Sequence, residues 1–126
     1  MKILVCEDEQ IMLTALEFRL QKQGFSVDIA PDGKVALEKL AIEIPDLIIL
    51  DLMMPFVSGL EIITHVRKKL KSSIPIIVIS ALEHDDTVLE AFQNGATDFV
   101  TKPFKPVELV LRIRRIFQEM EVSVAE

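Results

Sequence analysis

Residues 47–57 read Leu-Ile-Ile-Leu-Asp-Leu-Met-Met-Pro-Phe-Val, the longest apolar stretch of the chain, with one charged residue, Asp51, inside it. Every residue in the run before Asp51 is apolar, as in a strand buried on both faces at the centre of a parallel sheet. A carboxylate is costly to remove from water in such surroundings unless the protein uses it. The structural alternative is a cap on the turn after the strand. We take Asp51 as the first candidate functional residue.

Four further short runs are rich in Ile and Val and bounded by Pro, Gly or Asp. We expect strands at residues 3–6, 26–30, 47–50, 76–79 and 99–100. Amphipathic runs fill the intervals, and we expect helices near residues 11–21, 34–40, 60–70, 88–92 and 107–120. Five alternations of strand and helix require parallel pairing with right-handed crossovers. The sequence thus predicts an α/β fold, a three-layer (βα)5 doubly wound sheet of five parallel strands.

The composition is that of one acidic domain. With 126 residues, 50% of them hydrophobic, we expect a single domain over residues 1–126 and no output domain. The 14 Lys and Arg against 20 Asp and Glu give a net charge of −6, which disfavours nucleic acid and membranes as partners. One cysteine, Cys6, excludes an intramolecular disulfide and a multi-cysteine metal site. No stretch approaches the roughly 20 apolar residues of a membrane span, and we expect a cytoplasmic protein.

Polar side chains follow four of the five predicted strands. These are Glu7 and Asp8 after the first, Asp51 after the third, Ser80 after the fourth and Lys102 after the fifth. The carboxyl ends of parallel strands meet at one edge of the sheet, so we expect these groups to lie together. Three carboxylates against one ammonium require either protonation or a bound dication. Oxygen ligands without His or Cys favour Mg²⁺ or Mn²⁺ over zinc, and the set suits a phosphoryl group.

These residues and their neighbours match a known family. The matching segments are Glu7-Asp8, then Asp51-Leu52-Met53-Met54-Pro55 with Gly59, then Ser80-Ala81, and finally Asp98-Phe99-Val100-Thr101-Lys102-Pro103-Phe104. On these motifs the chain resembles, over nearly its whole length, the receiver domains of two-component response regulators. The resemblance implies a flavodoxin-like fold with strand order 2-1-3-4-5.

The resemblance also implies a role for each site residue. Asp51 is expected to be the phosphoacceptor, which receives a phosphoryl group from a phosphohistidine of a sensor histidine kinase or phosphotransfer protein. Lys102, preceding a cis peptide bond to Pro103, and Ser80 are expected to contact the phosphoryl oxygens. The expected Mg²⁺ ligands are Asp8, Asp51 and the backbone carbonyl of Met53, with Glu7 acting through water.

In the family, phosphorylation changes the surface of the fourth helix, fifth strand and fifth helix, through which a partner or output domain is controlled. Ser80 and Phe99 are the expected switch residues, although Phe99 is also a plausible core residue. In the OmpR-like subgroup this surface forms a homodimer, and Asp98 and Arg112 match two of its positions. That subgroup often has Asp where this chain has Thr97, so one ion pair of the dimer is missing here.

Two positions tune the lifetime of the phosphoryl group in this family, and here they are Met53 and Leu82. Both are apolar and neither positions a water molecule by hydrogen bonding. We therefore expect slow autodephosphorylation, in a signalling protein that catalyses only reactions of its own phosphoryl group.

Three alternatives stay open at this point. A Mg²⁺-dependent aspartyl-phosphate phosphatase needs a second Asp where Met53 stands. A nucleotide- or flavin-binding module needs a Gly-rich turn after the first strand, which the sequence lacks. The third alternative is a receiver-like scaffold that is not phosphorylated. Outside the site, the basic residues at 67–71 are interpreted as a solvated helix face.

Overall fold

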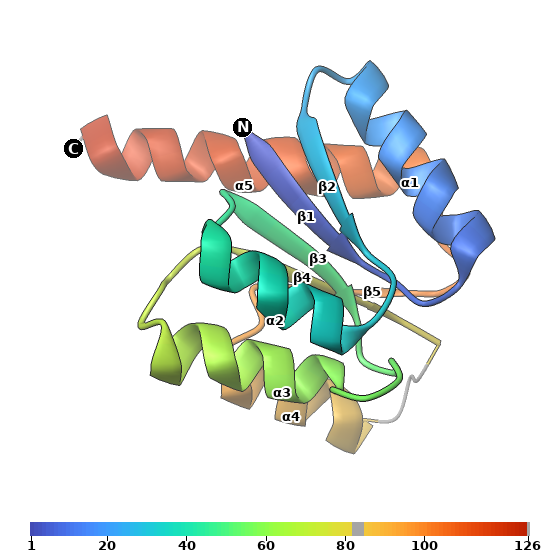
Figure 1. The fold of residues 1–126 in the computed structure, drawn as a ribbon. Helices are drawn as coiled ribbons and strands as arrows, with labels where there is room; N and C mark the ends of the chain where they lie inside the picture. The colour runs from blue at the N-terminus through green and yellow to red at the C-terminus, as the bar shows by residue number, and fades with distance from the viewer. Residues whose placement is uncertain (82–84, 126) are drawn as a thin grey trace.

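A computed structural model of the chain describes residues 1–81 and 85–125. One parallel sheet contains five strands in the order β2-β1-β3-β4-β5 (Figure 1). The strands are β1 (Lys2–Cys6), β2 (Ser26–Ala30), β3 (Leu47–Asp51), β4 (Ile76–Ser80) and β5 (Asp98–Thr101). The predicted fold class, strand positions and strand order are therefore confirmed. Asp51 and Ser80 are the last residues of their strands.

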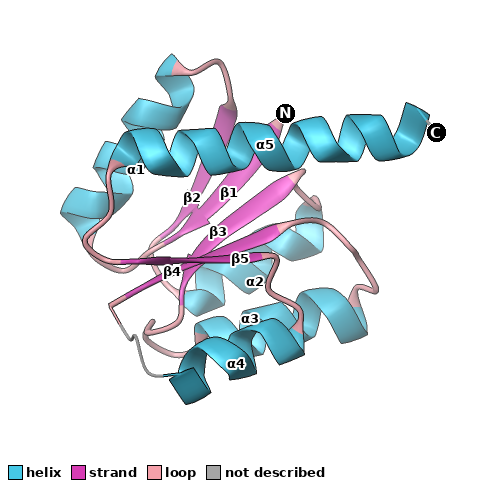
Figure 2. Cartoon of the chain, turned by 180° about the vertical axis from the view of Figure 1, so that it is seen from behind, coloured by secondary structure: helices cyan, strands magenta, loops and turns pink. Residues whose placement is uncertain are grey.

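Helices cover both faces of the sheet and complete the three layers. They are α1 (Gln10–Lys22), α2 (Gly33–Ile42), α3 (Gly59–Thr64), the π-helix η1 (His65–Lys69), α4 (Asp85–Asn94) and α5 (Pro106–Ala125). α1 and α5 lie on one face, and α2, α3 and α4 lie on the other (Figures 1 and 2). Among the described residues, no helix combines the length and apolar composition that crossing a bilayer requires.

The buried strands divide their side chains between two cores. In β1, Ile3 and Val5 belong to the core under α1 and α5, whereas Leu4 and Cys6 belong to the core under α2, α3 and α4. β3 and β4 alternate in the same way. Successive side chains of a strand point to opposite faces, so strands covered on both faces are apolar throughout. This explains why these strands show no polar alternation in the sequence.

The predicted helix over residues 60–70 is present, but its second half has a different pitch. α3 ends at Thr64, and a π-helical turn follows in which the Leu70 N–H donates to the His65 carbonyl at 2.9 Å. The wider turn takes the following side chains out of the 3.6-residue periodicity that the prediction assumed. Pattern counting finds the apolar stripe but not this change of pitch.

Arg67 corrects the interpretation of residues 67–71 as a solvated face. Its guanidinium donates hydrogen bonds to the carbonyls of Gly95, Ser72 and Ile74 over 2.7–3.0 Å. Burial lowers the pKa of Arg67 from its ordinary value. The side chain thus ties the end of α4 to the segment before β4, while Lys68 and Lys69 are exposed as expected.

Gly59 determines where the loop after Asp51 can run. A Cβ at this position would lie 2.5 Å from the carbonyl oxygen of Asp51 and 2.6 Å from Cα of Leu52. The Gly59 N–H also donates to the Leu52 carbonyl at 3.0 Å. Only glycine allows α3 to begin this close to the end of β3, so the position of Asp51 depends on it.

We predict that Gly59→Ala lowers the free energy of unfolding by about 3 kcal/mol, because backbone atoms must move to admit the methyl group. Gly24→Ala is the matched control, since φ there is 92° and nothing lies within 4 Å of the added Cβ. Its expected loss is about 1 kcal/mol, from the positive φ alone. Urea unfolding of both variants measures the difference, and equal losses would contradict the steric argument.

Candidate functional site

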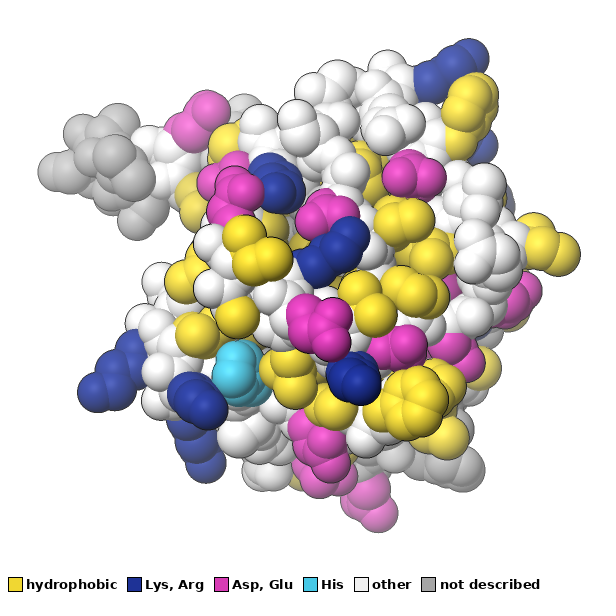
Figure 3. Space-filling view, viewed as in Figure 1, with side chains coloured by type: hydrophobic (Ala, Val, Ile, Leu, Met, Phe, Trp, Pro, Cys, Tyr) yellow, Lys and Arg dark blue, Asp and Glu magenta, His cyan; other side chains and the backbone are white. Residues whose placement is uncertain are grey.

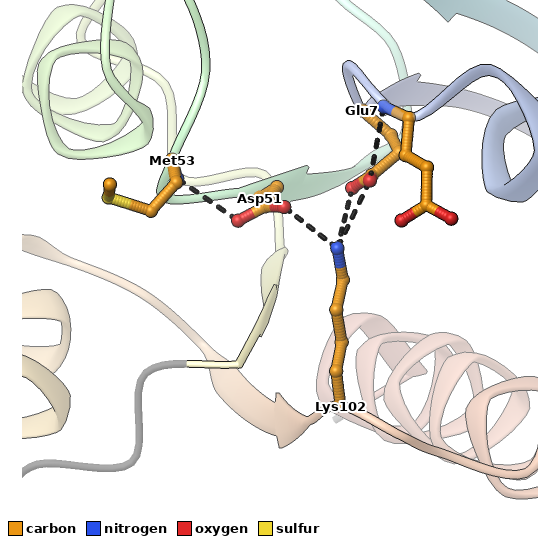
Figure 4. Close-up of polar contacts among 5 residues, drawn as sticks. Glu7, Asp51, Met53 and Lys102 are labelled. Atoms are coloured by element: carbon orange, nitrogen blue, oxygen red, sulfur yellow. Dashed lines mark hydrogen bonds and ion pairs between the residues drawn. The ribbon is translucent and has the colours of Figure 1, made fainter.

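The carboxyl edge of the sheet brings the predicted site residues together (Figure 4). Glu7 and Asp8 follow β1, Asp51 ends β3 and Lys102 follows β5. The Lys102 ammonium lies 2.8 Å from Oδ2 of Asp51, and 3.0 and 3.2 Å from the two carboxylate oxygens of Glu7. One cation therefore bridges two acids from different strands. The sequence predicted the meeting of these groups, but not that Lys102 would pair with Glu7.

Two backbone features hold Lys102 in place. Its N–H donates to the Ser80 carbonyl at 2.9 Å, which continues the pairing of β5 with β4. The peptide bond between Lys102 and Pro103 is cis, as the resemblance implied. The side chain is directed from β5 toward Asp51 and Glu7 (Figure 4).

Glu7 is the most perturbed acid of the site. Its side chain is 1% exposed, and burial raises its pKa to about 7 against the opposing hydrogen bond from Lys102, with the charge of Asp51 raising it further. For Lys102, burial lowers the pKa, but the hydrogen bonds with Asp51 and Glu7 outweigh it, so the pKa lies above its ordinary value. The cation stays charged, whereas Glu7 exchanges its proton near neutral pH.

The carboxylate of Asp51 is held at both oxygens. Oδ1 accepts from the Met53 N–H at 3.0 Å, and Oδ2 accepts from Lys102. Its side chain is 9% exposed, so little of the carboxylate group is open to solvent. The loop after β3 thus folds back onto the residue that precedes it, and the carboxylate is orientated before any ligand binds.

The acidic residues form a set that suits a hard cation. Glu7, Asp8 and Asp51 each offer a carboxylate oxygen, and these atoms lie within 4.8 Å of one another. Asp8 is exposed while the other two are buried. All three donors are oxygen, which matches the preference of Mg²⁺ or Mn²⁺. The backbone of Met53, fixed by its hydrogen bond to Asp51, lies beside them (Figure 4).

The predicted switch residues lie on β4 and β5. Ser80 is fully buried at the end of β4, beside β3, and its Cα partner in β5 is Thr101. Phe99 is half-buried and packs against the core under α2, α3 and α4. Leu82, named for phosphoryl lifetime, lies outside the described residues.

The predicted dimer residues pair within one chain. The Arg112 guanidinium lies 2.8 Å from Oδ2 of Asp98 and 3.0 Å from Oε1 of Glu108. They border a cavity of about 590 Å³ between β5 and α5, into which Val107 and Leu111 also open. Both of these apolar side chains are more than half exposed.

Sequence reasoning missed the exposed apolar side chains around the site. Met53 is 63% exposed and Phe56 is 82% exposed, both in the loop after Asp51. In the sequence they read as the end of a buried apolar stretch. The signal that separates them from it is Asp51 itself, which marks the point where the chain leaves the core.

Comparison with known proteins identifies the family of the chain. Residues 3–114 match the family model of the response regulator receiver domain. The chain belongs to this family. It is a receiver domain of two-component systems.

The chain is 37% identical over 122 residues to the alkaline phosphatase synthesis transcriptional regulatory protein PhoP of Bacillus subtilis. The aligned region covers 97% of this chain and 50% of PhoP. It is 40% identical over 116 residues to the response regulator ArlR of Staphylococcus epidermidis, covering 92% of this chain and 52% of ArlR. The chain thus spans about half the length of these relatives. The structure of a CheY-like receiver domain protein of Methanospirillum hungatei has a TM-score of 0.91 over 97% of each chain, and at 24% identity it supports the fold alone.

We predict that, in the presence of a chelator, the free energy of unfolding falls as pH rises from about 4.5 to 7. Glu7 has a folded pKa of about 7, above its ordinary value of 4.5, so the folded chain binds more protons in this window. Glu7→Gln removes the titration and raises stability at pH 8 by about 1 to 3 kcal/mol. Urea unfolding as a function of pH measures this, with exposed Glu9→Gln as the control. Parallel pH profiles of native and Glu7→Gln protein would contradict it.

Proposed function

We propose that this receiver domain is a phosphorylation-dependent switch in which Asp51 accepts a phosphoryl group from a phosphohistidine. The observation that carries the proposal is the environment of Asp51. Its carboxylate lies at the open edge of the sheet, fixed by Lys102 and the Met53 N–H, with two further acids beside it. A fixed carboxylate next to a cation suits nucleophilic attack on a phosphoryl group.

The transfer is a substitution at phosphorus. A carboxylate oxygen of Asp51 forms the new P–O bond as the P–N bond to the donor imidazole breaks. The electron pair of the broken bond stays on the imidazole nitrogen, which takes up a proton. Lys102 is placed to pair with a phosphoryl oxygen, and the Ser80 hydroxyl to donate a hydrogen bond to another. A sensor histidine kinase or a phosphotransfer protein is the donor in this proposal.

The acids fit a divalent cation, and we propose Mg²⁺, with Mn²⁺ as a substitute. Asp8, Asp51 and the backbone carbonyl of Met53 would hold it, with Glu7 acting through water. When bound, the ion supplies charge neutralisation for phosphoryl oxygens. Without such neutralisation the acids oppose the negative charge of a phosphoryl donor, since Lys102 offsets only one of them.

Phosphorylation changes the surface of α4, β5 and α5 in this proposal. A phosphoryl group adds about −1.5 to −2 charge beside Lys102. Ser80 moves toward it, and Phe99 turns into the space that Ser80 leaves. The equilibrium shifts between two arrangements that the chain already samples. A partner protein or a linked output domain responds to this change.

A homodimer through α4, β5 and α5 is part of the proposal. Asp98 and Arg112 satisfy each other within one chain. This face therefore offers a second copy its exposed apolar side chains, which are Leu89, Phe92, Val107 and Leu111. Neither nucleic acid nor a membrane is a proposed partner of this domain, whose net charge is −6.

The alternatives named from the sequence have less support. A phosphatase would need an acid at the position of Met53, whose side chain points away from Lys102 (Figure 4). A scaffold without phosphorylation would not need Lys102 to orientate Asp51. Slow autodephosphorylation remains our expectation, since Met53 offers no hydrogen-bonding group for an attacking water.

We predict that Asp8→Asn lowers the affinity for Mg²⁺ by about tenfold or more, because it removes a proposed ligand that makes no ion pair with any other described residue. Glu9→Gln removes the same charge from an exposed neighbour and is expected to change the affinity by less than about threefold. Calorimetric titration with Mg²⁺ measures both variants. Equal losses of Mg²⁺ affinity in the two variants would show that Asp8 acts through its charge and not as a ligand of the ion.

We predict that incubation with phosphoramidate and Mg²⁺ adds one phosphoryl group to the native chain, because a small donor needs only the site itself. Asp51→Asn abolishes the gain. Intact-mass spectrometry measures the reaction, and the adduct is expected to persist for minutes or longer after the donor is removed.

Asp46→Asn is the control for that experiment, because Asp46 lies at the opposite edge of the sheet, where it accepts from the Lys2 backbone N–H. It is expected to be phosphorylated like the native chain. Folded native protein without a mass gain would favour the scaffold, and an adduct lost within seconds would contradict slow autodephosphorylation.

A further inference from the structure

The loop between β3 and α3 contains a strained aromatic residue. Phe56 has φ of 71°, and the Val57 N–H donates to the Pro55 carbonyl at 2.8 Å, so residues 55–57 form a γ-turn. This turn is rare, and a positive φ is unfavourable for a bulky residue with a Cβ. Glycine or asparagine adopts this conformation more readily.

In the part of the chain that the structure describes, Phe56 packs into neither hydrophobic core, so no core contact compensates for this strain. Phe56 is 82% exposed and belongs to neither core, whereas its neighbours Met54 and Val57 pack against the core under α2, α3 and α4. Among the described residues, no aromatic or cation–π contact involves its ring. Stability of the domain therefore does not explain a phenylalanine here. Strain of this kind persists where the surrounding structure fixes it, and often at functional sites.

The surrounding structure fixes the direction of Phe56. The loop is closed at its base by the hydrogen bond from the Gly59 N–H to the Leu52 carbonyl. Across the loop, Gly33 approaches so closely that a Cβ there would lie 2.0 Å from the Val57 carbonyl oxygen. The aromatic side chain is consequently held outward before any partner arrives, which reduces the entropy lost on binding.

The ring of Phe56 lies in the loop that directly follows Asp51, the proposed phosphoacceptor. Met53, two residues after Asp51, is 63% exposed, and Figure 3 shows hydrophobic side chains gathered over this part of the molecule. On the other side of Asp51 lie Glu7, Asp8 and the exposed Glu9. Without a bound cation these acids repel the negative charge of a phosphorylated donor, whereas the attraction of the exposed apolar side chains does not depend on charge.

We propose that Phe56, supported by Met53, is the aromatic anchor on which a phosphohistidine-bearing protein docks beside Asp51. The occupant is a protein with an apolar pocket next to its phosphorylated histidine. A small phosphodonor reaches Asp51 without touching the ring. This inference rests on the proposed function and adds to it the residue that distinguishes a protein donor from a small one.

The test compares two donors on two variants. The protein donor is the autophosphorylated histidine kinase that phosphorylates the native chain fastest in a panel of such kinases, and the small donor is phosphoramidate. Phe56→Asn is expected to lower kcat/KM with the kinase by about tenfold or more, mainly through KM, as removal of an interface anchor does. Its rate with phosphoramidate stays native, and its thermal midpoint rises because asparagine accepts the positive φ.

The matched control is Ile42→Asn, which removes an apolar side chain that is 85% exposed at the opposite edge of the sheet. It is expected to leave both reactions unchanged, and Phe56→Tyr is expected to keep the kinase reaction. Native transfer from the kinase to Phe56→Asn would overturn the anchor, as would an equal loss with both donors. Failure of the native chain to react with phosphoramidate would overturn the proposed function itself.

Discussion

The structure depends on one interaction, the bridge from the Lys102 ammonium to the carboxylates of Asp51 and Glu7. These groups are 51 and 95 residues from Lys102 in the chain, so only the folded sheet brings them together. Two buried carboxylates this close repel each other, and the ammonium makes their proximity tolerable. Burial nevertheless raises the pKa of Glu7 to about 7, and the nearby charge of Asp51 adds to this rise. The site is thus built with an excess of negative charge.

This excess gives the site two properties that belong together. It favours a hard cation among the carboxylates of Glu7, Asp8 and Asp51, and it opposes an anionic donor that approaches the same edge. A divalent cation satisfies the preference of the carboxylates for positive charge. The exposed apolar side chains of Met53 and Phe56 offer an anionic donor an attraction that does not depend on charge. The polar interior of the site therefore suits a cation, and its apolar rim suits a protein donor.

The parts around the site differ in how firmly they are held. The central strands are buried on both faces, and the glycines at 33 and 59 pack the loop after β3 without space for a Cβ. At the far end of α4, Arg67 ties Gly95 to the segment before β4. Between these fixed points, α4 and β5 carry partly exposed side chains and have fewer constraints. Under the proposed function, a signal at Asp51 is most easily expressed there, since a packed core resists small displacements.

The sequence by itself determined the alternation of strands and helices and the residues that end the strands. Buried parallel strands are apolar throughout, so the polar residues that follow them, Asp51, Ser80 and Lys102, are visible without coordinates. Strand order came with the motifs of the family, not from periodicity.

Tertiary structure alone decided three things. It paired Lys102 with Glu7 as well as with Asp51. It directed Arg67, predicted to be solvated, to hydrogen bonds with backbone carbonyls. It also placed Phe56 at a positive φ, with its side chain directed outward. Each depends on atoms that meet across the fold or on a local change of pitch. Patterns along a sequence record which side of an element a residue occupies, but not which distant group it faces.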